Sequence, residues 1–373
     1  MVIRMKKRIL FGITNLKLGG AERVLVDIVN NICDKYDITI FTLYNKGEFE
    51  SELNKNIKVI SMFNKTYDEL SSIERRILSL RLVNKKARER LYHKYIKEDY
   101  DIEIAFLEGP IAWLLSVKSN ARKIAWVHND IRDVFGKGKK ADRKKKLSGE
   151  CYKKYESLVF VSKDNLDKFK MEYPDNKCNK QVIYNYLNTD LVLEKSNKEE
   201  VKDIKDDLIS FVQVSRIVPQ KALFRLLDVH EKLIKDDIKH RIYIVGDGLE
   251  MDELSNKIKE KELEDTFILL GKRSNPYPYI KKGNYFMLTS FYEGYPMVLL
   301  EAKALNKYIL ITDSAARETL IDYEDNSMIV DNNEDGIYNG IKSIIENKPE
   351  ISKKNKFDNK KVLRDIINLI EGE

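Results

Sequence analysis

The chain has 373 residues, a length that suffices for about two domains, each with its own hydrophobic core. Of these residues 43% are hydrophobic and 34% charged, which excludes a mostly disordered or fibrous protein. No run of about 18 apolar residues occurs, so no membrane-spanning helix is expected. Residues 1–185 hold 38 Lys and Arg against 25 Asp and Glu. This excess of positive charge is larger than the net charge of +7 of the whole chain, so the remaining residues carry a net negative charge. This asymmetry favours two domains with different partners.

In the first half of the chain, apolar runs of strand length alternate with amphipathic segments of helix length. This pattern is typical of a parallel sheet covered by helices. The opening residues loosely resemble a signal peptide, but they lack a small-residue cleavage site, so a first strand is expected instead. The predicted strands are 8–14, 38–44, 57–62, 102–107, 123–128, 157–162 and 181–186. The predicted helices are 21–33 and 72–97, the second with an apolar stripe of Ile73, Ile77, Leu80, Ala87, Leu91 and Tyr95.

Residues 188–206 are polar with little periodicity and are predicted to be a linker. A second alternating series follows, with predicted strands 208–215, 241–245, 267–271, 285–289 and 308–312. Its predicted helices are 222–235, 251–261, 277–282, 296–305 and 336–347. The sequence therefore predicts an α/β protein with Rossmann-like domains at 1–188 and 189–355. A final helix within 356–373 is expected to pack back toward the N-terminal domain.

Three loops follow predicted strands and precede predicted helices, which is where open α/β sheets bind ligands. In the first, Gly19 and Gly20 would allow a ligand to approach the backbone at a helix N-terminus. The alternative is a plain tight turn, since no G-x-G-x-x-G or Walker motif is present. In the second loop, Arg216 and Lys221 could close on one diphosphate, or they could be solvated surface cations.

The third loop places two carboxylates around a helix start. Gly294 permits an unusual backbone, and Pro296 suits the first helical position. Glu301 lies on the same helix face as Met297 and can reach back toward a ligand at the helix start, while Glu293 lies in the loop. Both could accept protons from sugar hydroxyls. For either one alone, the alternative is an acid that stabilises the helix dipole.

Glu293 and Glu301 enclose seven residues and resemble the E-x7-E element of the family-four retaining glycosyltransferases. Further elements similar to that family are Gly19-Gly20-Ala21-Glu22, Ser215-Arg216…Lys221, Gly246-Asp247-Gly248, residues 269–279, Trp126-Val127-His128-Asn129-Asp130 and Val182-Ile183-Tyr184-Asn185. They occur in the family's order along nearly the whole chain. The resemblance implies the GT-B architecture, two facing Rossmann-like domains with the active site in the cleft between them. Ala222 and Tyr186 depart from it, since the family usually has Gly and Pro there.

The resemblance also implies roles for single residues. Arg216 and Lys221 would neutralise the diphosphate of a nucleotide sugar, and Glu293 would hold hydroxyls of the transferred sugar. His128 would face the donor sugar from the first domain, although a single His after a strand is often structural. Glu301 would accept from the ribose hydroxyls. The donor-binding residues implied are Gly19, Gly20, Ser215, Gly246, Gly271, Lys272, Arg273, Asn275, Gly294, Tyr295, Pro296, Met297, Val298 and Glu301.

No cofactor and no metal are expected. Asp-x-Asp, His-x-His and His-Glu-x-x-His spacings are absent, and the three cysteines are far apart and fit no metal spacing. Arg216, Lys221 and a helix N-terminus would supply the positive field instead. The cysteine usage is that of a reduced, cytoplasmic protein.

Basic residues concentrate in segments 72–97 and 137–146. They could form a solvated face or dock on an anionic membrane surface, where each Lys or Arg contributes about 1 kcal/mol. Nucleic acid is not expected as a partner, because aromatic residues are not interleaved through these segments. The membrane-facing candidates are Arg75, Arg76, Lys85, Lys86, Lys139, Lys140, Lys144 and Lys145.

Together with these features, the resemblance implies a retaining, metal-independent hexosyl- or N-acetylhexosaminyltransferase. It would move a sugar from a nucleotide-sugar donor, expected to be a UDP-sugar, to a saccharide or lipid-linked glycan in surface polysaccharide synthesis. The expected location is the cytoplasm or the inner face of the plasma membrane. Two alternatives remain open: a GT-B nucleotide-sugar epimerase, and a non-catalytic membrane or nucleic-acid binder that retains the fold.

Overall fold

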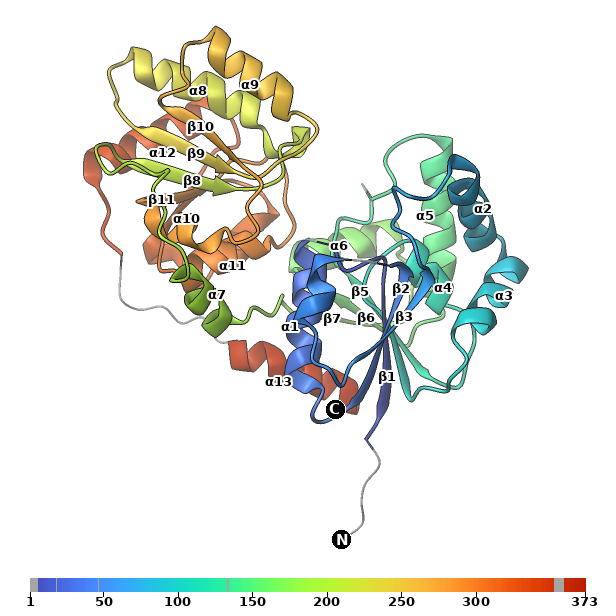
Figure 1. The fold of residues 1–373 in the computed structure, drawn as a ribbon. Coiled ribbons are helices and arrows are strands. Elements are labelled where there is room, and N and C mark those ends of the chain that lie inside the picture. The colour runs from blue at the N-terminus through green and yellow to red at the C-terminus, as the bar shows by residue number, and fades with distance from the viewer. Residues whose placement is uncertain (1–5, 18, 46, 133, 352–358) are drawn as a thin grey trace. The chain divides into compact units, whose positions relative to one another are not determined.

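The computed structural model describes residues 6–17, 19–45, 47–132, 134–351 and 359–373 (Figure 1). The chain divides into two compact units. Unit 1 comprises Met1–Tyr186 and Lys360–Glu373, and unit 2 comprises Leu187–Asn359. The predicted boundary between residues 355 and 356 lies outside the described residues, as does the start of the segment compared with a signal peptide.

Unit 1 contains a seven-stranded parallel sheet in the order β3-β2-β1-β4-β5-β6-β7. Its strands are β1 (Arg8–Ile13), β2 (Asp37–Tyr44), β3 (Lys58–Phe63), β4 (Ile102–Ala105), β5 (Arg122–Val127), β6 (Ser157–Phe160) and β7 (Asn179–Val182). Its α-helices are α1 (Gly20–Ile32), α2 (Ser72–Val83), α3 (Lys85–Tyr95), α4 (Pro110–Leu115), α5 (Lys139–Tyr152), α6 (Lys163–Glu172) and α13 (Asn359–Glu371). Helices α2 to α5 share one hydrophobic core, which includes Leu78, Tyr92, Leu115 and Tyr152. The central strands are apolar and buried because helices cover the sheet.

The C-terminal helix α13 packs within unit 1. Ile366, Leu369 and Ile370 are buried along one face of this helix. Glu371 accepts hydrogen bonds of 2.6 Å from the Lys7 ammonium and from the Tyr36 hydroxyl. These contacts attach the last helix to residues at the start of the chain.

Unit 2 contains a six-stranded parallel sheet in the order β10-β9-β8-β11-β12-β13. Its strands are β8 (Ser210–Val214), β9 (Arg241–Val245), β10 (Phe267–Gly271), β11 (Tyr285–Leu288), β12 (Tyr308–Thr312) and β13 (Ser327–Val330). Its α-helices are α7 (Thr189–Ser196), α8 (Leu223–Lys235), α9 (Met251–Glu260), α10 (Tyr277–Lys282), α11 (Met297–Ala304) and α12 (Glu334–Asn347). The prediction of an α/β fold with two Rossmann-like domains is confirmed.

The predicted helix over residues 72–97 is wrong in two respects. Asn84 has a ψ of 122° and its side chain accepts a hydrogen bond from the Ala87 N–H, so it ends α2 and caps α3. The predicted apolar stripe is wrong in its first half, because Ile73, Ile77 and Leu80 are exposed, whereas Leu91 and Tyr95 of its second half do pack in the core of unit 1. Leu78 and Leu82 are the α2 residues that enter the core.

Several other boundaries differ from the predictions. Helix α7 occupies the start of the predicted linker and packs on α10 and α11. Helix α11 begins at Met297, with Pro296 in extended conformation as its N-cap. The last strand of unit 1, Asn179–Val182, starts two residues and ends four residues earlier than predicted, and β13 was not predicted.

Candidate functional site

In unit 2, four loops leave the carboxyl ends of adjacent parallel strands. They follow β8, β9, β10 and β11, which are neighbours in the sheet. The strand order reverses between β8 and β11, and ligands of open α/β sheets bind at such a reversal. The two loops at this point are Ser215–Lys221 and Thr289–Pro296, which contain most of the predicted catalytic residues.

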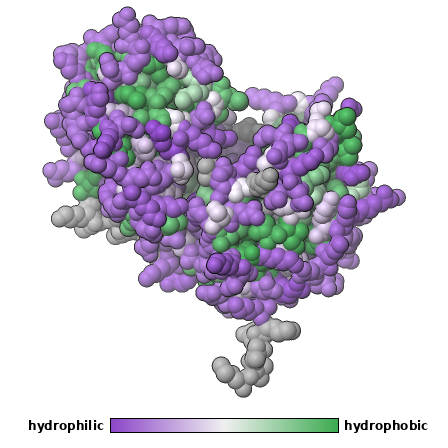
Figure 2. All heavy atoms as spheres, viewed as in Figure 1, coloured by the Kyte–Doolittle hydropathy of each residue, from purple (hydrophilic) through white to green (hydrophobic). Residues whose placement is uncertain are grey.

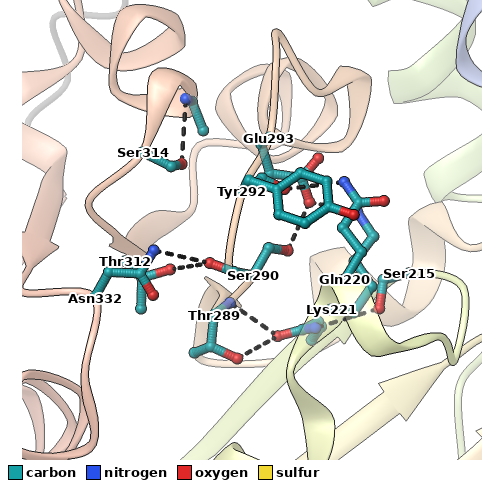
Figure 3. A network of polar contacts seen from close by, with 12 residues as sticks. Ser215, Gln220, Lys221, Thr289, Ser290, Tyr292, Glu293, Thr312, Ser314 and Asn332 are labelled. Carbon is teal, nitrogen blue, oxygen red and sulfur yellow. Dashed lines mark hydrogen bonds and ion pairs between the residues drawn. The ribbon is translucent and has the colours of Figure 1, made fainter. Parts of the chain in front are cut away.

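An ion pair joins these two loops (Figure 3). Nζ of Lys221 lies 2.5 Å from Oε1 of Glu293, and the two side chains are only 11% and 9% exposed. The Ser290 hydroxyl donates a 2.6 Å hydrogen bond to the same carboxylate oxygen. The backbone N–H of Phe291 donates to the Gln220 carbonyl at 2.9 Å. The structure therefore brings Lys221 and Glu293 together although 72 residues separate them.

A layer of uncharged polar groups fixes the backbone beneath Glu293. The carbonyl of Ser290 accepts hydrogen bonds from the Thr312 hydroxyl at 2.7 Å and from the Asn332 amide at 3.3 Å (Figure 3). Gln213 accepts from the Thr289 N–H at 3.3 Å and donates to the Ser215 hydroxyl at 3.2 Å. This layer positions the ion pair, because both loops are attached to buried groups of the sheet.

The glycines after β9 allow two loops to lie in backbone contact. Gly246 has a φ of +151°, and a Cβ there would lie 1.9 Å from the Ser215 carbonyl oxygen. A Cβ on Gly248 would lie 2.2 Å from the carbonyl oxygen of Ile217. Side chains at these positions would push the Ser215–Lys221 loop away. Gly248 belongs to the motif read in the sequence, but its structural role was not predicted.

Other predicted residues of unit 2 lie around these loops. Arg216 is exposed, and its side chain has no hydrogen bond or ion pair among the residues that the structure describes. Glu301 accepts a 3.4 Å hydrogen bond from the Tyr277 hydroxyl. Arg273 pairs with Asp203 at 3.3 Å. The Asn275 amide donates to the Lys195 carbonyl at 2.9 Å and thereby attaches this loop to the end of α7.

The remaining predicted donor residues differ in their exposure and backbone conformation. Gly271 has a φ of +71° and ends β10. Lys272 is exposed on the surface. Met297 is buried at the first position of α11. The half-buried residues of the loop and of α11 are Gly294, Tyr295, Pro296 and Val298.

In unit 1, the predicted residues lie at the carboxyl ends of β1 and β5. Gly19 is the N-cap of α1 in extended conformation, and Gly20 begins that helix. His128 follows β5, and its ring packs on Phe106 at a centroid distance of 4.8 Å. Burial lowers the pKa of His128 to about 3, so the ring is neutral at pH 7. Its Nε2 is buried without a hydrogen-bond partner in the described part of the chain.

Glu108 supports His128 and was not predicted. It lies beyond the end of β4, is 7% exposed, and accepts a 3.1 Å hydrogen bond from the His128 N–H. Its other oxygen accepts from the Asn129 amide. Burial raises the pKa of Glu108, and the hydrogen bond from Asn129 partly offsets this rise. The sequence does contain a signal for Glu108, because it is a carboxylate within an apolar run, just before Gly109 and Pro110.

The described residues hold neither a metal-binding cluster nor a membrane-spanning helix. No cluster of three or more His, Cys, Asp and Glu side chains suited to a metal ion occurs among them. None of the helices they form combines the length and apolarity needed to cross a membrane.

Sequence comparison relates the chain to known enzymes. Residues 194–361 match the model of the family described as Glycosyl transferases group 1. The chain is 27% identical to the N-acetylgalactosamine-N,N'-diacetylbacillosaminyl-diphospho-undecaprenol 4-alpha-N-acetylgalactosaminyltransferase of Campylobacter jejuni, over 96% of this chain and 98% of that enzyme. It is 24% identical to an alpha-1,4-N-acetyl-D-galactosaminyltransferase of the same organism, over 79% of this chain and 76% of the other.

Solved structures share the fold. HepE of Anabaena in complex with UDP-glucose has a TM-score of 0.74 and 18% sequence identity, with 98% of this chain and 100% of the other covered. Sucrose-phosphate synthase from Thermosynechococcus elongatus has a TM-score of 0.77 and 13% identity, with 98% and 99% covered. The comparisons confirm both the resemblance to family-four glycosyltransferases and the GT-B fold.

Proposed function

We propose that this glycosyltransferase moves a hexosyl or N-acetylhexosaminyl group from a UDP-sugar to a lipid-linked glycan, with retention and without a metal ion. The single observation that carries the site assignment is the ion pair between Lys221 and Glu293 at the strand-order reversal of unit 2. In this pair, a cation that would bind the diphosphate lies beside a carboxylate that would bind the sugar. The lipid-linked acceptor is supported by the undecaprenol-linked substrates in the names of the Campylobacter relatives.

The proposed reaction breaks the bond between the sugar's anomeric carbon and the β-phosphate oxygen. The acceptor hydroxyl forms its new bond on the same face of the sugar, and its proton passes to the departing phosphate oxygen. Arg216 and Lys221 stabilise the charge that develops on this oxygen. Such a step requires positioning and charge stabilisation more than covalent participation by the protein.

Glu293 would hold sugar hydroxyls while Lys221 holds phosphate. Its Oε1 already accepts from Lys221 and Ser290, whereas its Oε2 has no hydrogen bond among the residues described. One carboxylate can therefore orient both the lysine and the sugar. His128 is neutral at pH 7 and can offer a hydrogen bond to the donor sugar, but it does not carry a proton for general acid catalysis.

The donor assignment is tested by thermal unfolding with UDP, GDP, UDP-glucose and UDP-N-acetylgalactosamine. A ligand at 100 times its dissociation constant stabilises the protein by about 2.7 kcal/mol. Stabilisation by UDP compounds and not by GDP is the expected result, and no stabilisation by any nucleotide would contradict the proposal. Transfer should persist in excess chelator, whereas loss of transfer that a divalent metal restores would exclude the metal-independent reaction.

We further propose that the enzyme works in the cytoplasm, at the inner face of the membrane that holds its acceptor. Cell fractionation should recover it with the plasma membrane at low salt.

A further inference from the structure

Helix α2 exposes a row of large apolar side chains. Ile73, Ile77 and Leu80 are 69%, 44% and 62% exposed. Their spacing places them on one face of the helix, while Leu78 and Leu82 on the opposite face enter the core of unit 1. Single exposed apolar residues are ordinary, but three in one row indicate an interaction surface. We call Ile73, Ile77 and Leu80 the α2 stripe.

Arginines border the α2 stripe on both sides. With 3.6 residues per turn, Arg76 lies about 60° to one side of Ile73 and Arg81 about 80° to the other. Both are exposed, and in the described part of the protein neither side chain has a hydrogen bond or ion pair. The acidic residue of α2 is Glu74, which is engaged in the capping box with Ser71. The exposed face of α2 is therefore apolar in the middle and basic at its margins.

Two basic residues of this region point elsewhere, and one of them, Arg75, was a predicted membrane-facing residue. Arg75 lies 4.4 Å from the Tyr67 ring centroid and donates to the Asp68 carbonyl, so it is held against unit 1. Arg88 is buried and donates to the Leu82 carbonyl at 2.7 Å, which attaches the start of α3 to the end of α2. The exposed basic side chains that continue from α2 into α3 are Lys85, Lys86, Arg90 and Lys94.

Helix α5 extends this charge on the same layer of unit 1. Helices α2 and α5 both pack against α4 and share one core on one face of the sheet (Figure 1). The exposed basic residues of α5 are Lys139, Lys140, Arg143 and Lys146, and Lys144 and Lys145 are half-buried. In Figure 2, hydrophobic side chains gather over α2 at the right of the view, and hydrophilic surface surrounds them.

We infer that α2 lies in the surface of an anionic lipid bilayer, with the α2 stripe inserted among the acyl chains and Arg76 and Arg81 at the phosphates. An amphipathic helix with a basic margin binds a membrane in this way. The excess of cations along α2, α3 and α5 favours an anionic surface as the occupant. The inference rests on the proposed function in one respect, since a lipid-linked acceptor gives membrane docking a purpose.

Vesicle sedimentation of the full chain tests this inference. The parent should sediment with phosphatidylcholine vesicles that contain phosphatidylglycerol and not with phosphatidylcholine alone. The variant Ile73→Ser/Ile77→Ser/Leu80→Ser should bind about tenfold or more weakly. A matched control is Met171→Ser on α6, which removes a side chain that is 72% exposed elsewhere on unit 1 and should bind like the parent.

The salt dependence of vesicle binding distinguishes insertion of the α2 stripe from electrostatic attraction to the anionic lipid. The Debye length shrinks from about 10 Å at 0.1 M to about 3 Å at 1 M, so the charge contribution is screened. The parent should retain measurable binding at high salt through the α2 stripe, while the triple serine variant should retain none. Arg76→Gln/Arg81→Gln should weaken binding at low salt and change it little at high salt.

A fluorescent residue in the α2 stripe reports depth directly. The chain has two tryptophans, Trp113 and Trp126, and both are buried. In Leu80→Trp, the added indole should shift its emission to shorter wavelength when anionic vesicles are present. An unchanged spectrum, or equal sedimentation of the parent and the triple serine variant, would overturn the inference. If the parent does not bind vesicles and instead self-associates through the α2 stripe, the inference is overturned and the surface is an interface between copies of the chain.

Nucleotide binding distinguishes this result from a failure of the proposed function. The stripe variant should show the same thermal stabilisation by UDP as the parent, because α2 belongs to unit 1 and the phosphate loops belong to unit 2. Vesicle binding without nucleotide binding would contradict the proposed function and would still support α2 as a membrane-binding helix.

Discussion

The ammonium of Lys221 and the carboxylate of Glu293 form a largely buried ion pair between the loops that follow β8 and β11. Each residue therefore restricts the other before any substrate arrives. A buried pair stabilises little by itself, but loss of one partner leaves the other charge uncompensated. We therefore expect the pair to contribute mainly to the positioning of the diphosphate and the sugar, and little to the stability of the fold.

Lys221→Ala should weaken UDP binding and lower transfer by on the order of 10²-fold, because it removes one preorganised charge at the departing diphosphate. Arg216→Ala should have a similar effect on transfer. The measurements are the dissociation constant for UDP and kcat for transfer. Lys239→Ala, which removes a cation with a 71% exposed side chain elsewhere in unit 2, serves as the control. Parent-like kinetics of Lys221→Ala would remove this residue from the site.

Glu301→Gln and Glu293→Gln should differ in kind. A ribose hydroxyl is held equally in the ground and transition states, so Glu301→Gln should raise KM for the donor and change kcat little. Glu293→Gln should lower kcat more than it weakens donor binding. An identical, purely KM defect in both variants would show that the two carboxylates do not have separate roles.

Gly246→Ala should destabilise unit 2 by about 3 kcal/mol or more, because it combines an unfavourable φ with overlap against the Ser215 carbonyl. Gly271→Ala is the matched control. Gly271 has a φ of +71°, but a Cβ there meets nothing within 4 Å, so this variant should lose only about 1 kcal/mol. Calorimetry measures both, and equal losses would mean that contact with the Ser215–Lys221 loop is unimportant.

His128 should make unit 1 less stable in acid. Its folded pKa is about 3, far below the usual value of 6.5, so the unfolded state binds the proton first as the pH falls. Stability is therefore lost below about pH 6.5, by up to about 1.4 kcal/mol per pH unit until the folded pKa is reached. Urea unfolding followed by the fluorescence of Trp113 and Trp126 should show a smaller difference between pH 7 and pH 5 in His128→Gln.

The exposed His93 of α3 provides the control for this measurement. His93→Gln should show the parental pH dependence. If His128→Gln also keeps the full dependence, other groups are responsible for the acid sensitivity of unit 1.

Local patterns in the sequence predicted the alternating strands and helices, and the loops at the carboxyl ends of strands followed from them. They could not show which face of α2 is buried, because Ile73, Ile77 and Leu80 form one apolar row and Leu78 and Leu82 form another. Periodicity defines faces, whereas packing partners decide between them. The sequence prediction used the wrong row.

Contacts between distant residues could be predicted only in part. The family resemblance placed Lys221 and Glu293 in one site, but their direct ion pair depends on the fold of two loops. Ala222 departs from the usual glycine, yet it adopts a left-handed φ of 54°, so the loop keeps a glycine-like backbone. Glu108 was missed because its role depends on a hydrogen bond to a backbone N–H on the neighbouring strand's loop.

The position of α13 has a consequence for synthesis on the ribosome. Unit 1 is interrupted by unit 2 and is completed only when residues 360–373 are translated. At about 5–20 residues per second, the ribosome needs roughly 10 to 40 seconds to add the intervening chain. During this time unit 1 lacks α13 and its buried side chains Ile366, Leu369 and Ile370, while unit 2 can already fold. We therefore expect the apolar surface of unit 1 that this helix covers to stay exposed until the last residues have been added.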